Sequence, residues 1–369
     1  MSGAASDIGQ ARRIDVAVVH DGNMLAPPIM RVLLGHFRVG EVRLETPDIA
    51  TLRAAKAIVF CLARVKPQQA PILRRLAARF PAPPIFVFPT FQKENLDVAE
   101  GIEGAAHFVA PINRKAVTNA VRTALQRGVE AAWAKLRPVE RTALTSSVES
   151  FDAAFGAIAK GEKMPIAQVY SACENIQATL ADTSVDRWLD ALQQHHDSSF
   201  RHSMLVCGAL AFFSHDLGIR GEDLRKITVG TFLHDAGKAL VPVAILDKPG
   251  KLEPDEFKVI QRHPVYSREV LTRQEDVHPD VIAMAASHHE KLDGTGYPDG
   301  LKGGQISDIV RLTAIADVYS ALVEERAYKP GMSNERAFKI MLGQKDHLDT
   351  ALTMRFREYV MDVFQTEAA

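Results

Sequence analysis

Short apolar runs alternate with longer helical patterns through the first third of the sequence. An uninterrupted run of apolar, often β-branched residues is typical of a strand buried on both faces of a sheet. Strands are expected at residues 14–20, 41–46, 57–63, 84–89 and 105–111. Between them, apolar residues recur every three or four positions, notably over 69–80 and 113–126. This alternation predicts a flavodoxin-like, doubly wound α/β domain with a parallel sheet at 14–130.

After residue 130 the pattern becomes helical throughout. Amphipathic segments such as VESFDAAFGAIAKG, which ends at Gly161, are separated from the next by Pro165. We expect a helical connector over 131–185, which leaves dimerisation through it open. An all-α domain should follow at 186–369, and residues 1–13 should form a flexible tail.

The composition is that of an ordinary globular protein with two domains. The chain has 369 residues, of which 47% are hydrophobic. Its longest apolar runs are too short to span a bilayer, and the segment MSGAASDIGQARR lacks the apolar core of a signal peptide. We therefore expect a cytoplasmic protein with no membrane association. Three widely spaced cysteines favour buried thiols and exclude a cysteine-based zinc site.

Charge is distributed unequally along the chain. Residues 1–130 contain 17 Lys and Arg against 11 Asp and Glu, whereas the remainder contains 27 against 34. Opposite net charges support a two-part organisation and allow the parts to attract each other. The first part is not basic enough to indicate a nucleic-acid partner.

The first domain is similar to the receiver domain of response regulators in the order and spacing of its elements. Asp21 follows the first expected strand, Thr90 the fourth, and Ala110-Pro111 the fifth. That family's phosphoacceptor aspartate would end the third strand, where Cys61-Leu62 stands here, and its lysine is replaced by Ala110. The resemblance implies a pseudo-receiver that cannot be phosphorylated and that meets a signalling partner by surface contacts. An unrelated α/β domain is the alternative.

Histidine and aspartate residues interrupt apolar helical patterns in the C-terminal half, where ten of the 13 histidines fall at or after residue 195. The candidates are His202, His234, Asp235, His263, His288, His289 and Asp317. Burying so many imidazole and carboxylate groups without partners would cost several kcal/mol each. A shared metal centre removes this cost, because a divalent ion binds both kinds of group. The residues therefore favour a metal site over scattered structural histidines.

The motifs around these residues resemble the HD-GYP family of metal-dependent phosphohydrolases, which hydrolyse cyclic di-GMP. The motifs are HDAGK (234–238), the His263-Pro264 pair, HHEKLDGTGYPDGLKG (288–303) and RLTAIADVYSALVEERAYKP (311–330). The similarity covers about residues 186–365. It implies two divalent metal ions, iron or manganese, held by the seven candidates, with Asp235 as the bridging and catalytic carboxylate.

The same resemblance assigns the substrate contacts. Lys238 would neutralise phosphate oxygens and assist proton transfer, while Arg326 and Lys329 would grip the phosphates. Tyr297 lies at the centre of a Gly-rich loop whose glycines allow a dinucleotide to approach the backbone closely. The expected reaction converts cyclic di-GMP to linear pGpG, with further hydrolysis to GMP left open.

The sequence also departs from the family pattern. Ser320 replaces a frequent aspartate, Lys291-Leu292 replaces Arg-Trp, and VEERAYKP replaces a more common Thr-Ser-Asp-Arg-Pro-Tyr segment. These changes leave open a phosphodiesterase for another cyclic dinucleotide, or a cyclic-dinucleotide receptor without catalysis. Ser198 stands one helical turn before His202, where members with a third metal ion carry glutamate. We therefore expect two metal ions, with His195 too distant to join them.

Overall fold

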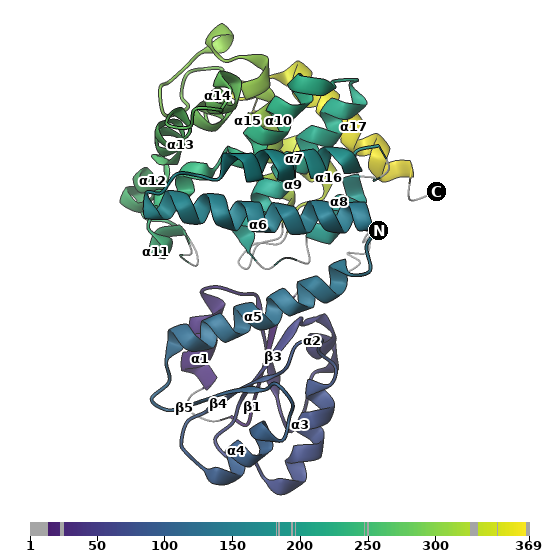
Figure 1. The fold of residues 1–369 in the computed structure, drawn as a ribbon, viewed down its shortest axis with the longest axis vertical. Coiled ribbons are helices and arrows are strands. Elements are labelled where there is room, and N and C mark those ends of the chain that lie inside the picture. Colours follow the sequence, from purple (N-terminus) through teal and green to yellow (C-terminus); the bar gives the residue numbers. More distant parts are fainter. Residues whose placement is uncertain are drawn as a thin grey trace, which may run out of the picture. The chain divides into compact units, whose positions relative to one another are not determined.

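The computed structural model divides the chain into two compact units, Met1–Ala132 and Trp133–Ala369 (Figure 1). The structure describes residues 14–22, 26–181, 183, 185–192, 195, 197–246, 248, 251–324, 331–344 and 346–366. The predicted limits of the tail, connector and C-terminal domain stay predictions. Within the described residues, no helix combines the length and apolar character needed to cross a membrane.

The first unit is built on a five-stranded parallel sheet in the order β2-β1-β3-β4-β5. The strands are β1 (Val16–His20), β2 (Val39–Arg43), β3 (Ala57–Cys61), β4 (Ile85–Phe88) and β5 (Ala106–Val109). The three central strands are apolar and buried on both faces, which is why they read as continuous apolar runs. The predicted flavodoxin-like class is confirmed, and β2 lies at an edge of the sheet.

Helices cover both faces of this sheet. The elements are α1 (Ala26–Leu34), α2 (Ile49–Ala54), η1 (Pro67–Gln69), α3 (Ala70–Ala77), α4 (Lys93–Glu100) and α5 (Arg114–Trp133). One core lies between the sheet and α1 with α5, where Leu33 and Val121 are fully buried. The other lies under α2, α3 and α4, where Phe60 stacks on Phe86. Alternate residues of each strand supply the two cores.

The described part of the second unit is helical. Its elements are α6 (Pro138–Lys160), α7 (Ile166–Thr179), α8 (Val185–Leu192), α9 (Ser198–Asp216), α10 (Gly221–Leu233), η2 (Ala236–Leu240), α11 (Val243–Leu246), α12 (Pro254–Ile260), α13 (His263–Thr272), α14 (Pro279–Ser287), η3 (Gly303–Gln305), α15 (Asp308–Val323), α16 (Asn334–Gly343) and α17 (Thr350–Thr366). The predicted all-α class of this half is confirmed.

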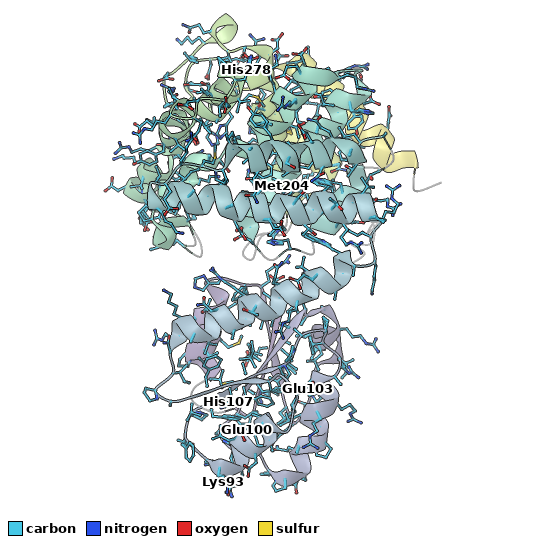
Figure 2. The ribbon with its side chains drawn as sticks, viewed as in Figure 1. Lys93, Glu100, Glu103, His107, Met204 and His278 are labelled. Carbon is cyan, nitrogen blue, oxygen red and sulfur yellow. The ribbon has the colours of Figure 1, made fainter. Side chains whose placement is uncertain are left out.

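Helix α9 forms the centre of this unit. Nearly all of its residues are buried, including Met204, which is marked in Figure 2. A Cβ atom at Gly208 would lie 2.2 Å from Trp188 Nε1, so glycine lets α8 approach α9 closely. Helices α10 and α15 pack beside α9 around an apolar cluster that includes Phe213 and Tyr319. This packing brings polar residues from distant parts of the sequence to one place.

Candidate metal centre

Seven buried or partly buried side chains of the second unit form three overlapping groups that could each hold a cation. The groups are His263, His288 and His289; His202, His234 and Asp317; and His234, Asp235 and His288. Within each group the potential ligand atoms lie within 4.8 Å of one another. Together the groups contain all seven candidates identified from the sequence. Whether each acts as a ligand remains a proposal, but the fold does bring all seven together.

Helix termini supply most of these residues. His234 directly follows the last residue of α10, and Asp235 comes next, just before η2. His263 is the first residue of α13, and His288 follows the last residue of α14. His202 and Asp317 differ because they lie inside the long helices α9 and α15.

Asp235 lies between the histidines. Its Oδ1 atom is 3.2 Å from His263 Nε2 and 3.8 Å from His288 Nε2. Its Oδ2 atom is 3.3 Å from His234 Nε2 and 3.9 Å from His202 Nε2. One carboxylate therefore faces four imidazoles, two with each oxygen.

Asp317 closes the other side of the cluster. Its Oδ1 atom is 2.9 Å from His202 Nε2 and 4.0 Å from His234 Nε2, and its Oδ2 atom is 3.8 Å from His289 Nδ1. The buried Nε2 atom of His234 makes no well-formed hydrogen bond to any described residue. A buried nitrogen without such a partner, surrounded by carboxylate and imidazole groups, fits a site that binds a divalent cation.

The main chain orients three of the imidazole rings. The Nδ1 atom of His234 is 2.7 Å from the Thr231 carbonyl oxygen, and that of His263 is 2.7 Å from the Ile260 carbonyl oxygen. The Nδ1 atom of His288 is 3.2 Å from the carbonyl oxygen of Ala285. An Nδ1–H group that donates to a carbonyl leaves Nε2 as the lone-pair nitrogen, which is the form that binds a metal.

Two of the imidazoles and both carboxylates have shifted pKa values that favour the forms able to bind a metal. Burial holds the pKa of His288 well below its usual value, and it lowers the pKa of His289 to about 3 against the opposing charge of Asp317. Burial would raise the pKa of Asp235, but Lys238 and His234 hold it well below normal. The pKa of Asp317 is likewise held low, despite burial, by hydrogen bonding to His202. His288 and His289 are therefore neutral at pH 7, and both carboxylates are ionised.

His234 shows the opposite shift. Burial favours its neutral form, but the adjacent Asp235 carboxylate outweighs burial and raises the pKa of His234. In the absence of a cation, the two aspartates thus favour the protonated form of this imidazole.

A close backbone approach places Lys238 and His263 beside Asp235. The Nζ atom of Lys238 donates to Asp235 Oδ2 at 2.5 Å. A Cβ atom at Gly237 would lie 2.1 Å from the His263 carbonyl oxygen, so only glycine fits between η2 and the start of α13. The Gly237 amide donates to the buried Ser267 hydroxyl at 2.8 Å and ties the two elements together.

The Gly-rich loop folds back onto the histidine pair. A Cβ atom at Gly296 would lie 2.5 Å from the Cα atom of Glu290, and the Tyr297 amide donates to the His289 carbonyl oxygen at 3.3 Å. The Tyr297 ring stacks on the His289 ring, with centroids 4.8 Å apart. Tyr297 therefore covers a candidate ligand directly.

Glu290 holds this loop in place. Its carboxylate is buried and accepts hydrogen bonds from the amides of Asp299 at 2.7 Å, Gly300 at 3.1 Å and Leu301 at 3.0 Å. Three amide donors satisfy a buried charge that would otherwise be very costly. The sequence analysis missed this role; the only signal was an acidic residue next to the histidine pair.

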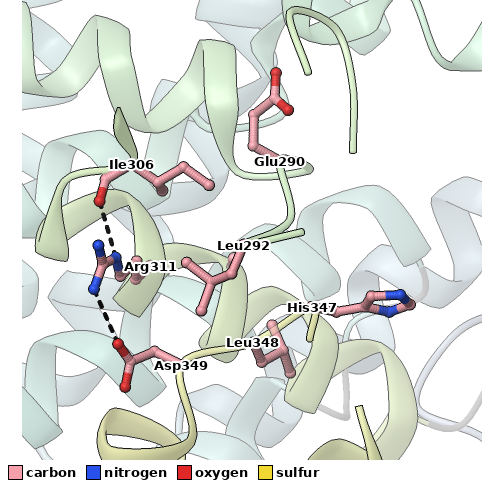
Figure 3. A pocket seen from close by; sticks show the side chains of 8 residues that line it. Glu290, Leu292, Ile306, Arg311, His347, Leu348 and Asp349 are labelled. Atoms are coloured by element: carbon pink, nitrogen blue, oxygen red, sulfur yellow. Dashed lines mark hydrogen bonds and ion pairs between the residues drawn. The ribbon is translucent and has the colours of Figure 1, made fainter. Parts of the chain in front are cut away.

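A small pocket lies beside the same loop (Figure 3). Arg311 Nε donates to the Ile306 carbonyl oxygen at 2.9 Å, and Arg311 Nη1 donates to Asp349 Oδ2 at 3.0 Å. The Glu290 side chain points away from Arg311 (Figure 3). The charged groups around the pocket thus serve to join the loop to α15 and to the start of α17.

Other predicted residues lie outside the cluster. Ser198 is exposed at the first turn of α9, and His195 precedes that helix, where its ring lies against Trp133 and Phe200. The predicted phosphate-binding residues Arg326 and Lys329 fall outside the described residues. In the first unit, Cys61 and Leu62 are fully buried at the end of β3. The three cysteines are buried, as expected.

The sequence is similar to those of known proteins. A family model described as HD domain matches residues 188–352. The chain is 31% identical to the protein named Cyclic di-GMP phosphodiesterase PA4108 of Pseudomonas aeruginosa over 271 residues, which are 73% of this chain and 63% of that protein. It is 34% identical to the 3'3'-cGAMP-specific phosphodiesterase 3 of Vibrio cholerae over 51% of this chain and 40% of that protein.

Among solved structures, Bd1817, a HDG"Y"P protein from Bdellovibrio bacteriovorus, matches 66% of this chain and 80% of its own, with a TM-score of 0.49 and 17% identity. The chain spans less than two thirds of the length of each of the two curated relatives.

Proposed function

Because the chain belongs to the HD-GYP family of HD-domain proteins, we propose that it is a metal-dependent phosphodiesterase that hydrolyses cyclic di-GMP to linear pGpG. The observation that carries this proposal is the cluster of five histidines and two aspartates, in which Asp235 faces four of the histidines. The relative PA4108, which is named for cyclic di-GMP hydrolysis, aligns with 73% of the chain and supports this substrate.

His202, His234, Asp235, His263, His288, His289 and Asp317 would hold two divalent ions, and family resemblance favours iron or manganese. When bound, such ions supply Lewis acidity, which lowers the pKa of water and neutralises phosphate charge. The exposed position of Ser198 and the packing of the His195 ring against Trp133 and Phe200 support two ions rather than three.

Lys238 is the charged residue best placed to act on a phosphate. Its Nζ atom touches Asp235, and its side chain keeps a quarter of its surface exposed, so it can reach both the cluster and a ligand. As an ammonium group it would neutralise a phosphate oxygen and hold a proton near the leaving oxygen. Tyr297 would exclude water from one side of His289, because its ring already covers that imidazole. The proposed phosphate contacts of Arg326 and Lys329 rest on family resemblance.

A second substrate is supported by one comparison. The Vibrio cholerae relative named for 3'3'-cGAMP shares 34% identity with this chain. Both cyclic dinucleotides carry the same phosphodiester chemistry and differ in one base. Selectivity would then depend on contacts to the bases rather than on the metal cluster.

The first unit would regulate this activity without phosphorylation. The buried Cys61-Leu62 pair offers no carboxylate at the end of β3, which supports a pseudo-receiver that binds a signalling partner through its surface. Dimerisation through α6 and α7 is part of the same proposal.

Product analysis tests the proposed reaction. The metal-loaded protein is incubated with equimolar cyclic di-GMP and 3'3'-cGAMP, and both are followed by chromatography. The proposal predicts loss of cyclic di-GMP with appearance of pGpG. Preferential loss of 3'3'-cGAMP would favour the second substrate. Binding without loss of either would indicate a receptor.

A further inference from the structure

The imidazole ring of His202 is oriented differently from its neighbours. His234, His263 and His288 each place Nδ1 within 3.2 Å of a main-chain carbonyl oxygen in the preceding turn. They can be held this way because all three lie at helix ends. His202 lies inside α9, where main-chain carbonyls are already used by the helix, and its buried Nδ1 makes no hydrogen bond to any described residue.

One carboxylate faces this nitrogen. Glu324 Oε2 lies 3.7 Å from His202 Nδ1, and within the described residues no other carboxylate oxygen lies within 4.0 Å of it. Glu324 is almost fully buried and follows the last residue of α15. It comes two helical turns after Asp317, which faces the Nε2 atom of the same ring at 2.9 Å. Helix α15 thus presents one carboxylate to each nitrogen of His202.

Glu324 is held by a buried cation. The Nη2 atom of Arg201 lies 3.3 Å from Glu324 Oε1, and its Nη1 atom donates to the His195 carbonyl oxygen at 3.0 Å. Arg201 precedes His202 on α9, so the pair joins α9 to the end of α15. A buried ion pair of this kind is costly to form and is weak evidence for stability alone, which favours a role in positioning.

The position of the ring proton gives Glu324 a specific role. A neutral imidazole carries one proton. In the metal-free protein the 2.9 Å contact to Asp317 is a hydrogen bond, which places that proton on Nε2. When Nε2 binds a cation instead, the proton must be on Nδ1, and it then needs an acceptor. Carboxylates are frequent acceptors for the second nitrogen of a metal-bound histidine.

We propose that Glu324, held by Arg201, is a positioning residue that accepts the Nδ1–H of His202 and fixes Nε2 as a metal ligand. This inference rests on the proposed metal-binding role of His202. This role could not be predicted from the family resemblance, because Glu324 falls in the segment that departs from the common family pattern.

Mn²⁺ affinity, measured by chelator competition without any nucleotide, tests this role. Glu324→Ala should weaken Mn²⁺ binding about 10- to 100-fold. Glu324→Gln should lose less Mn²⁺ affinity than Glu324→Ala, because the glutamine amide oxygen still accepts the Nδ1–H of His202. Glu324→Ala leaves the buried Arg201 charge without this partner, and that variant can fail to fold. In that case Mn²⁺ affinity is measured on the double variant Arg201→Met with Glu324→Met, which removes both buried charges. The matched control Glu335→Gln, at the exposed start of α16, should bind Mn²⁺ as the wild type does.

Wild-type Mn²⁺ affinity in a folded Glu324→Ala or double variant would overturn the inference, and so would equal losses in the Gln and Ala variants. In zinc-loaded protein with ¹⁵N-labelled histidine, Glu324→Gln should shift the Nδ1–H resonance of His202; an unchanged resonance would also overturn it. A wild-type protein that binds Mn²⁺ but hydrolyses no cyclic dinucleotide would refute the proposed function and leave this inference intact.

Discussion

The Nε2 atom of His202 lies 2.9 Å from Oδ1 of Asp317, although 115 residues separate them in the sequence. The contact forms because α9 and α15 pack side by side in the core of the second unit. Each residue interrupts an otherwise apolar helix, so their burial is tolerated only if they have each other or a shared cation as a partner.

Asp317→Asn should remove one of the two carboxylates of the cluster. The amide is neutral and a poor ligand, so we expect Mn²⁺ affinity to fall by at least about 100-fold, the upper end of the loss seen for outer partners of metal ligands. Elemental analysis and chelator competition measure this. Asp308→Asn, at the exposed start of the same helix, is the control and should bind Mn²⁺ with wild-type affinity. Equal Mn²⁺ affinity in the two variants would argue against Asp317 as a ligand.

Gly237→Ala should separate η2 from α13. The new methyl group would lie 2.1 Å from the His263 carbonyl oxygen and 2.5 Å from the Ser267 amide nitrogen, and both are backbone atoms that cannot rotate away. We expect a loss of about 1–3 kcal/mol in the free energy of unfolding, together with weaker metal binding. Denaturant unfolding measures the first quantity. Gly156→Ala, in α6 with no atom within 4 Å, should be neutral or stabilising.

Glu290→Ala should release the Gly-rich loop. The amides of Asp299, Gly300 and Leu301 would lose their acceptor, so their hydrogen exchange should accelerate. Loss of these charged hydrogen bonds should cost on the order of 2 kcal/mol. Exchange mass spectrometry of peptides covering residues 295–302 measures the effect. Glu269→Ala, an exposed position on α13, is the control. Unchanged exchange in the Glu290 variant would show that the loop is held by other contacts.

Acid should destabilise the metal-free protein. The pKa of His288 is held well below 6.5 by burial, and that of His289 is lowered to about 3. Below pH 6.5 the unfolded chain therefore binds protons that the folded chain does not, so the free energy of unfolding falls as pH falls. The opposite shift at His234 offsets part of this loss. Urea midpoints measured in chelator above and below pH 6.5 give the slope, and a midpoint that rises on acidification would contradict this.

Phosphodonors should not label the first unit. The position that would carry the phosphoacceptor holds Cys61 and Leu62, which are both fully buried. Incubation with acetyl phosphate followed by intact mass measurement should show an unchanged mass. A phosphate mapped to residues 14–130 would contradict the pseudo-receiver interpretation.

The fold class and the seven candidate residues could be predicted because each depends on a local signal. Buried parallel strands read as apolar runs, and a polar residue such as Asp317 stands out inside an apolar helix. The roles of Glu290 and Glu324 could not be predicted in this way. Both are acidic residues in polar segments, and only the folded chain shows that their carboxylates are buried and which groups they face.

The need for glycine at position 237 could not be predicted from the sequence either. Glycine after an HD pair reads as a turn residue, whereas its requirement comes from the His263 carbonyl oxygen, which lies 26 positions further along the sequence. Close approaches between distant backbones leave no periodic pattern.

Turnover of cyclic di-GMP by the metal-loaded wild-type protein, compared with the His234→Ala/Asp235→Ala double variant, tests the central claim most directly. Both proteins are purified, reconstituted anaerobically with Mn²⁺ or Fe²⁺, checked for fold by circular dichroism and assayed by chromatography. The account predicts that the wild type converts cyclic di-GMP to pGpG and that the double variant, which lacks the central carboxylate, does not. A wild-type protein with no turnover above the double variant would contradict it.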